Sequence, residues 1–173
     1  MLAYCAAMSE PPTRARLSGE DLETWAALAT VLEWLPSALD DQLQRDSDLT
    51  HFEYGVLFAL DSAPDRTLRM SVLAGYANSS LSRLSRAASR LESRGWVRRA
   101  PDPSDGRYTL AALTDDGRRK VEEATPGHVD TVHRLVLDPL TRSQARQLRA
   151  ITRRITRAIR DEGGWQPPPD PAC

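Results

Sequence analysis

The sequence contains little cysteine and no long apolar run. Its two cysteines, Cys5 and Cys173, stand near opposite ends of the 173 residues. There is no Cys-x-x-Cys pair or Cys/His cluster of the kind that binds zinc, so we expect both thiols to be unpaired. No apolar run approaches the roughly 20 residues that span a membrane. The N-terminus has no charged region before its short apolar patch, which argues against a signal peptide. These absences favour a cytoplasmic protein.

Motifs of enzymes and of metal sites are also missing. The sequence has no Gly-x-Ser-x-Gly elbow, no P-loop, no Rossmann glycine set and no catalytic Cys-His context. Its three histidines are His51, His128 and His133. The last two are five positions apart and so do not share a helix face, and no carboxylate stands at His-Glu-x-x-His spacing. We therefore expect no enzymatic activity, no metal and no cofactor.

Charge is balanced over the whole chain but segregated along it. The 23 basic and 24 acidic residues give a formal net charge of −1. Positions 17 to 62 hold ten acidic residues and one basic residue, Arg45, whereas positions 79 to 99 hold six arginines and one acidic residue, Glu92. A local cluster of arginines indicates a segment that contacts nucleic acid.

The basic segment begins with a predicted helix over residues 79–94. Ser79 or Ser80 suits its N-cap, and Gly95 suits the position just after its last turn. At about 100° per residue, one arc is apolar and contains Leu81, Leu84, Ala88 and Leu91. The opposite arc is polar and contains Ser79, Ser82, Arg83, Arg86 and Arg90. A helix with one apolar face and one arginine-serine face suits a DNA major groove, where arginines bond guanine edges or phosphates.

A β-hairpin is predicted directly after this helix. Residues 96–100 and 108–113 have the composition of strands, and the intervening PDPSDGR (101–107) has that of a tight polar turn. The hairpin carries Arg98, Arg99 and Arg107. These arginines predict that it lies against the DNA backbone as a wing.

The run from Leu81 to Arg118 resembles the signature of the MarR family of winged-helix regulators. In that family the recognition helix ends in Leu-Glu-x-Arg/Lys-Gly-Trp/Leu-Val, which is Leu91–Val97 here. The wing carries Asp-x-Arg, here Asp105–Arg107, and Leu-Thr-x-x-Gly, here Leu113–Gly117, opens a long helix. The order and spacing of the three pieces are specific together, and a looser resemblance extends over roughly residues 18–162.

The resemblance implies a homodimeric transcription regulator, most often a repressor, that binds a pseudo-palindromic operator in double-stranded DNA. Arg107 would enter the minor groove, held in its pose by Asp105. The DNA-binding residues implied are Ser79, Ser80, Ser82, Arg83, Arg86, Arg90, Arg98, Asp105 and Arg107. The alternative is a winged-helix module that binds proteins and has lost DNA binding. The presence of Arg83, Arg86 and Arg107 favours DNA.

The resemblance also implies a small-molecule effector, since members often bind small aromatic, phenolic or hydrophobic ligands between the dimer helices and the DNA-binding region. In this chain that crevice would be formed by Trp25, Trp34, His51, Tyr54 and His128. For the tryptophans, simple core packing is an equally good explanation, because large aromatic residues dominate cores.

We predict a mainly α-helical fold with a small β-hairpin wing. Residues 17–45 and 115–162 are the expected dimerisation helices around a winged helix-turn-helix at 46–114. Residues 1–16, with a second possible start at Met8, and 163–173 are an expected disordered arm and tail. Pro36 is expected to kink or divide the first helix, and Pro126-Gly127 to bend the long helix after the wing.

The last predicted helix is a rival for the DNA-binding face. Its polar side carries Arg142, Arg146, Arg149, Arg153, Arg157 and Arg160. Its apolar side carries Leu148, Ile151, Ile155 and Ile159. Charge alone does not choose between the two helices, but only the 79–94 helix has a short preceding helix (71–76), a turn and a wing. We expect the final arginines to be solvated or paired with acidic residues of the first helix across a dimer.

Overall fold

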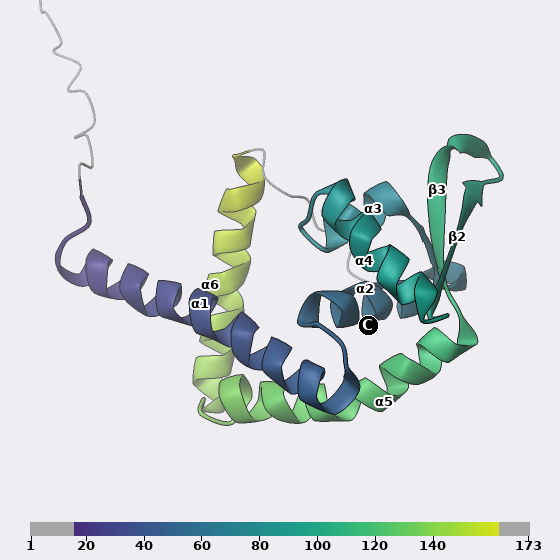
Figure 1. Ribbon diagram of the computed structural model, residues 1–173. Coiled ribbons are helices and arrows are strands. Elements are labelled where there is room, and N and C mark those ends of the chain that lie inside the picture. The colour runs from purple at the N-terminus through teal and green to yellow at the C-terminus, as the bar shows by residue number, and fades with distance from the viewer. Residues whose placement is uncertain (1–15, 163–173) are drawn as a thin grey trace, which may run out of the picture. The chain divides into compact units, whose positions relative to one another are not determined.

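The computed structural model describes residues 16–162 (Figure 1). Both cysteines, the predicted tail and all but Arg16 of the predicted arm lie outside the described residues. The helices are α1 (Gly19–Ser47), α2 (His51–Asp61), α3 (Met70–Tyr76), α4 (Leu81–Ser93), α5 (Asp115–Val132) and α6 (Arg142–Asp161). The strands are β1 (Thr67–Arg69), β2 (Val97–Asp102) and β3 (Asp105–Leu113). The mainly helical fold with a small hairpin is therefore confirmed. Within residues 16–162, no helix is both long and apolar enough to cross a membrane.

The chain divides into two compact units, residues 1–34 and 35–173. The described part of the first unit is the N-terminal part of α1. Glu20 and Asp21 lie in its first turn, where the helix dipole favours negative charge. The side chains of Trp25, Leu32 and Trp34 are more than half exposed, at 52%, 57% and 73%.

Proline does not end either long helix. α1 continues as one helix through Pro36, so of the two predicted alternatives a division is wrong and a kink stays a prediction. α5 likewise continues past Pro126 to Val132 and passes into a π-helical turn at His133–Leu137. A proline inside a helix removes one backbone hydrogen bond, and the remaining bonds of these long helices are enough to carry the helix past it.

The core of the second unit surrounds α2. Its Val56, Leu57 and Leu60 are buried among leucines of the neighbouring elements, including Leu73 of α3 and Leu84 of α4. The predicted capping box starts this helix, because the Thr50 hydroxyl accepts from the backbone of Glu53 and the Glu53 carboxylate accepts from the backbone of Thr50. The helix-turn-helix and the sheet therefore both pack against α2.

The three strands form an antiparallel sheet in the order β1-β3-β2. β2 and β3 pair from Val97 opposite Leu113 outward to Asp102 opposite Asp105, with an irregularity between Pro101 and Asp102. The turn at the tip is therefore shorter than the predicted 101–107 segment. Pro101 is compatible with the longer strand because β2 lies at an edge of the sheet. Figure 1 shows this hairpin projecting from the helical body.

The base of the hairpin is fixed to the start of α5. Thr114 caps α5 by accepting from the backbone of Gly117, and its hydroxyl donates to the Gly95 carbonyl at 2.7 Å. A Cβ added at Gly117 would collide with the Trp96 carbonyl oxygen. The glycine of Leu-Thr-x-x-Gly is therefore needed for close packing between the helix and the hairpin.

Candidate nucleic-acid interface

α3, a tight turn and α4 form the helix-turn-helix. The turn is closed by hydrogen bonds from the backbone of Ala77 and Ser79 to the carbonyls of Leu73 and Ala74, and Asn78 adopts a left-handed conformation, with φ 41°. Asparagine tolerates this region better than most residues. Ser80 then caps α4, its hydroxyl accepting from the backbone of Arg83 at 3.3 Å, so one of the two proposed caps is confirmed.

The buried side of α4 sets which residues face outward. Leu84, Ala87, Ala88 and Leu91 are each at most 1% exposed. Leu81 was predicted to belong to this apolar face, but it is 53% exposed. It lies in the first turn of α4, before the helix reaches the core, and Ala87 completes the buried face instead. The outward side is consequently centred on Ser82, Arg86 and Ser89, all exposed.

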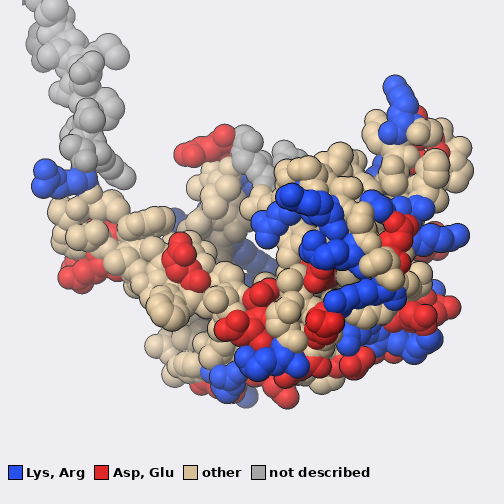
Figure 2. All heavy atoms as spheres, viewed as in Figure 1, with Lys and Arg blue, Asp and Glu red and all other residues tan. Residues whose placement is uncertain are grey.

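The three arginines predicted on this face have different surroundings. Arg90 donates from Nε to Oε1 of Glu53 at 2.8 Å, and the guanidinium carbon of Arg83 lies 4.6 Å from the centroid of the Phe52 ring. Both side chains therefore contact α2. Within the described residues, Arg86 makes no ion pair. Figure 2 shows basic side chains gathered over α4 and at the tip of the hairpin.

Glu53 is the buried partner in this contact, with 6% of its surface exposed. Burial opposes its ionisation, but hydrogen bonds from Thr50 and Arg90 outweigh this effect and hold the pKa of the carboxyl below its ordinary value. Glu53 is thus charged at neutral pH and joins the first turn of α2 to the last turn of α4.

The wing places Asp105 and Arg107 together at its tip. Nη2 of Arg107 donates to Oδ2 of Asp105 at 2.7 Å, Nε donates to Oδ1 at 3.0 Å, and the backbone of Arg107 donates to Oδ1 at 3.2 Å. Hydrogen bonds from Arg107 lower the pKa of Asp105. The Arg107 side chain remains 84% exposed, so the acid orients the arginine without covering it.

Arg98 and Arg99 of β2 have contrasting roles. Arg98 is exposed. Arg99 instead donates to Glu92 of α4 through Nη2 at 2.7 Å and Nε at 2.9 Å, and to the Ser89 hydroxyl at 2.9 Å. Arg99 therefore fixes the wing against α4, and its predicted contact with the DNA backbone stays a prediction.

The contact that braces the tip of the wing was not predicted from the sequence. Asp102 is 7% exposed and accepts from Nε of Arg69 at 2.8 Å, and from the backbone and hydroxyl of Ser104 at 2.8 and 2.7 Å. The hydrogen bonds from Ser104, and then Arg69, lower the pKa of Asp102 to about 2. The Arg69 guanidinium also lies 4.5 Å from the centroid of the Tyr108 ring. The Asp-Pro-Ser sequence was a signal for this turn, but nothing local identified Arg69.

Three of the five residues predicted for an effector crevice come together. The ring centroid of His128 lies 5.6 Å from that of His51 and 4.6 Å from that of Tyr54. Burial lowers the pKa of both histidines. Tyr54 is 5% exposed and hydrogen bonds Thr125, so it is part of the core. Trp25 and Trp34 lie in the first unit.

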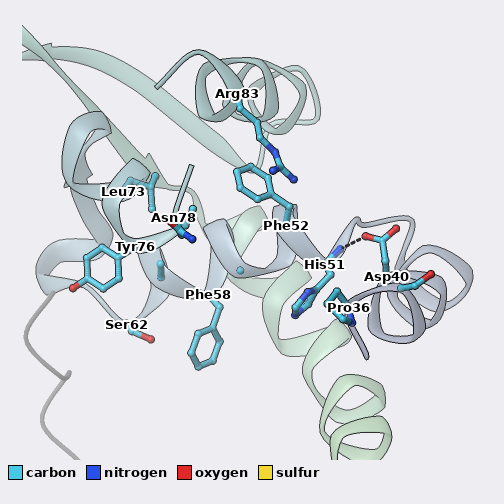
Figure 3. A pocket seen from close by; sticks show the side chains of 14 residues that line it. Pro36, Asp40, His51, Phe52, Phe58, Ser62, Leu73, Tyr76, Asn78 and Arg83 are labelled. Carbon is cyan, nitrogen blue, oxygen red and sulfur yellow. Dashed lines mark hydrogen bonds between the residues drawn. The ribbon is translucent and has the colours of Figure 1, made fainter. Parts of the chain in front are cut away.

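A cleft of about 890 Å³ is lined by His51 but not by Tyr54 or His128 (Figure 3). At one edge of the cleft, the backbone of His51 donates to Asp40 at 2.7 Å. At another edge, the guanidinium of Arg83 lies over the Phe52 ring. The aromatic lining that sequence analysis missed is Phe52, Phe58 and Tyr76. Among the described residues, no group of three or more His, Cys, Asp or Glu side chains is arranged to hold a metal.

Comparison with known proteins agrees with the fold and with the helix-turn-helix. A family model described as MarR family matches residues 47–107. The crystal structure of Sco3205, a MarR family transcriptional regulator from Streptomyces coelicolor in complex with DNA, has a TM-score of 0.80 and 42% identity, covering 83% of this chain and 94% of that one. The PcaV transcriptional regulator from the same organism, in complex with its natural ligand, has a TM-score of 0.67 and 26% identity, covering 83% and 99%.

The transcriptional repressor MprA of Escherichia coli K12 is 30% identical over 99 residues, which are 57% of this chain and 56% of that one. The chain therefore spans about half the length of this curated relative. The α3-turn-α4 unit with its β2-β3 hairpin defines a winged helix-turn-helix protein. The chain belongs to the MarR family. The proteins that it resembles are transcriptional regulators, not enzymes, which confirms the expectation drawn from the missing catalytic motifs.

Proposed function

We propose that this protein is a homodimeric, sequence-specific DNA-binding transcription regulator that represses its targets and is released from DNA by a small ligand. The observation that carries the proposal is the outward face of α4, where Arg86 stands unpaired among the described residues between exposed Ser82 and Ser89. A free arginine among short polar residues is suited to a major groove, because it reaches base edges that bulkier neighbours would block.

The wing supports the same function. Arg107 projects from its tip with a pose set by Asp105. An arginine that is exposed yet oriented loses less conformational freedom on entering a narrow minor groove, where negative potential is concentrated. Arg98 would contact phosphates beside it. Sco3205, which is 42% identical, forms a complex with DNA, and this similarity supports DNA binding by the present chain.

Dimerisation is supported by α6. The helix has no buried residue, and one side carries Leu148, Ile151, Ile155 and Ile159, which are 39–53% exposed. A capping box between Thr141 and Gln144 specifies its start, so the sequence encodes this helix although nothing within the described residues of the second unit covers its apolar side. A second copy of the chain would cover it. Two recognition helices related by a two-fold axis would then require a pseudo-palindromic operator.

Repression and release by a ligand are supported by two relatives and by a cleft in this chain. The relative MprA is a transcriptional repressor, and PcaV forms a complex with its natural ligand. In this chain the cleft between α2 and the helix-turn-helix has aromatic walls and ends near Arg83 of α4. Such a site suits an aromatic, phenolic or hydrophobic ligand. Trp25, Trp34, Tyr54 and His128 remain further candidates for ligand contact.

A gel-shift titration with DNA upstream of the protein's own gene tests the proposal. Because bound arginines release counterions from the phosphates, the logarithm of the affinity should fall linearly with the logarithm of salt concentration. A random fragment of equal length should bind more weakly at every salt concentration. Equal binding to both fragments would remove sequence specificity, and no binding to either would favour the protein-interaction module.

A further inference from the structure

Leu81 is an exposed apolar residue that takes no part in core packing. It is the first residue of α4, directly after the Ser80 cap, and it is 53% exposed. It does not belong to the buried core or to the partly buried residues that pack against it. It also lines neither the aromatic cleft nor the smaller polar groove beside Arg86.

The position of Leu81 on α4 defines what it faces. Ser85, one turn later, lies on the same side of the helix, and its hydroxyl accepts from Nη1 of Arg99 on β2 at 3.4 Å. Leu81 is therefore at the N-terminal end of α4, on the side toward the wing and next to the outward stripe of Ser82, Arg86 and Ser89. In helix-turn-helix proteins the first residues of the recognition helix approach the base edges most closely.

We infer that Leu81 is a specificity-determining residue that contacts the 5-methyl group of a thymine in the major groove. This inference rests on the proposed DNA-binding function and adds to it one apolar determinant of sequence. The thymine methyl is the apolar group that the four bases present in the major groove, and proteins recognise it by apolar side chains. The surrounding residues are serines and arginines, which hydrogen bond, so Leu81 is the side chain of this face suited to a methyl group.

The test replaces single thymines by uracils, because this change removes the methyl and leaves base pairing intact. DNA that the wild-type protein selects from a random pool is synthesised with one uracil at each thymine in turn, and affinities are measured by fluorescence anisotropy. At one thymine in each half-site, uracil should weaken wild-type binding about three- to fivefold, the effect expected for burying one methyl group. Leu81→Ala should bind the thymine and uracil forms of that site equally.

Two matched variants control for indirect effects. Ser93→Ala changes an exposed residue at the other end of α4 without removing an apolar group, so it should keep the wild-type response to uracil. Leu81→Met keeps an apolar side chain and should retain most of that response. Alanine and methionine both favour helices, so α4 should form in each variant.

The outcomes separate this inference from the proposed function. If selected DNA binds tightly but no thymine is sensitive to loss of its methyl, or if Leu81→Ala keeps the wild-type sensitivity, the role of Leu81 is wrong while sequence-specific binding stands. If the wild-type protein selects no DNA, the proposed function and this inference fail together. Sensitivity that is lost in Leu81→Ala and retained in Ser93→Ala supports the contact.

Discussion

Arg90 near the end of α4 and Glu53 in the first turn of α2 form an ion pair, with 2.8 Å between Nε and Oε1. The same carboxylate caps α2 through the backbone of Thr50. Glu53 therefore stabilises the start of α2 and also fixes the orientation of α4. Arg90 was predicted as a DNA contact, and the structure gives it a second task in positioning Arg86, one turn earlier on α4.

The first prediction concerns this pair. Glu53→Ala removes a helix cap and leaves Arg90 without its partner, so it should lower the free energy of unfolding by about 1–3 kcal/mol. Arg90→Ala should cost less, because the Thr50 capping box survives. Urea denaturation of both single variants and the double variant measures the coupling. Additive effects would show that the pair does not act as a unit.

The pair should also make stability depend on pH in one direction. The pKa of Glu53 is lowered on folding, so its contribution is complete above the unfolded value and is lost as pH falls through the folded one. Wild-type protein should therefore lose stability on acidification more steeply than Glu53→Gln between about pH 5 and pH 3. Parallel stability curves for the two proteins would contradict this.

The second prediction separates two roles for Asp105. Electrostatic repulsion alone predicts tighter DNA binding when the acid is removed. The geometry at the tip of the wing predicts the opposite, because Asp105 fixes the pose of Arg107 by accepting hydrogen bonds from its guanidinium and its backbone. Arg107→Ala and Asp105→Ala should both weaken operator binding, and the double variant should be little worse than either. Fluorescence anisotropy titrations measure the affinity of each variant for the operator. Arg98→Ala is the control, because it changes a wing arginine that does not belong to this pair. A tighter-binding Asp105→Ala protein would leave the acid as an ordinary turn residue.

The third prediction concerns the brace beneath that tip. The pKa of Asp102 is lowered to about 2, with Ser104 the larger cause and Arg69 the smaller. Carboxyl NMR titration should give a midpoint near 2 in the wild type. Ser104→Ala and Arg69→Leu should each raise the midpoint, because each removes a hydrogen bond to the carboxylate, and both variants should speed amide exchange at the tip. A wild-type midpoint near the ordinary value of 3.8 would mean that the brace does not persist in solution.

The fourth prediction tests the dimer. Replacing Leu148 and Ile155 by glutamate would bury uncompensated charge in the proposed interface, at a cost of several kcal/mol for each. Sedimentation should show a wild-type dimer and a monomeric or unfolded variant. Arg149→Glu, on the polar side of the same helix, is the matched control and should remain dimeric. A folded, monomeric wild-type protein at micromolar concentration would rule out the obligate dimer.

Much of this fold was predictable because its signals are local. The caps at Thr50, Ser80 and Thr114 lie within three residues of the groups that they bind, and the Asp105–Arg107 pair spans two positions. The α4 helix and the hairpin followed from residue spacing, and the helix-turn-helix from the resemblance to the MarR family. The exposure of Leu81 was not predictable in this way, because periodicity gives the direction of a side chain but not where along the helix the core begins.

The contacts that orient the site were not predictable in the same way. Arg90 and Glu53 are 37 positions apart, and Arg69 and Asp102 are 33 positions apart. A sequence shows each of these charges, but the choice of partner depends on how separate elements pack. The aromatic cleft was missed for this reason too: Phe52, Phe58 and Tyr76 come together only when α2 packs against α3.

The central claim is that α4 recognises specific bases through Arg86, and one comparison tests it most directly. The affinities of wild-type protein and Arg86→Ala are measured on the selected operator and on random DNA of the same length, each over a range of salt concentrations. If Arg86 bonds a base edge, the variant should lose roughly 1–3 kcal/mol on the operator and much less on random DNA. An equal loss on both, with the salt slope reduced by about one unit, would make Arg86 a phosphate contact. Affinity equal to the wild type on both would contradict the assignment of α4 as the DNA-binding helix.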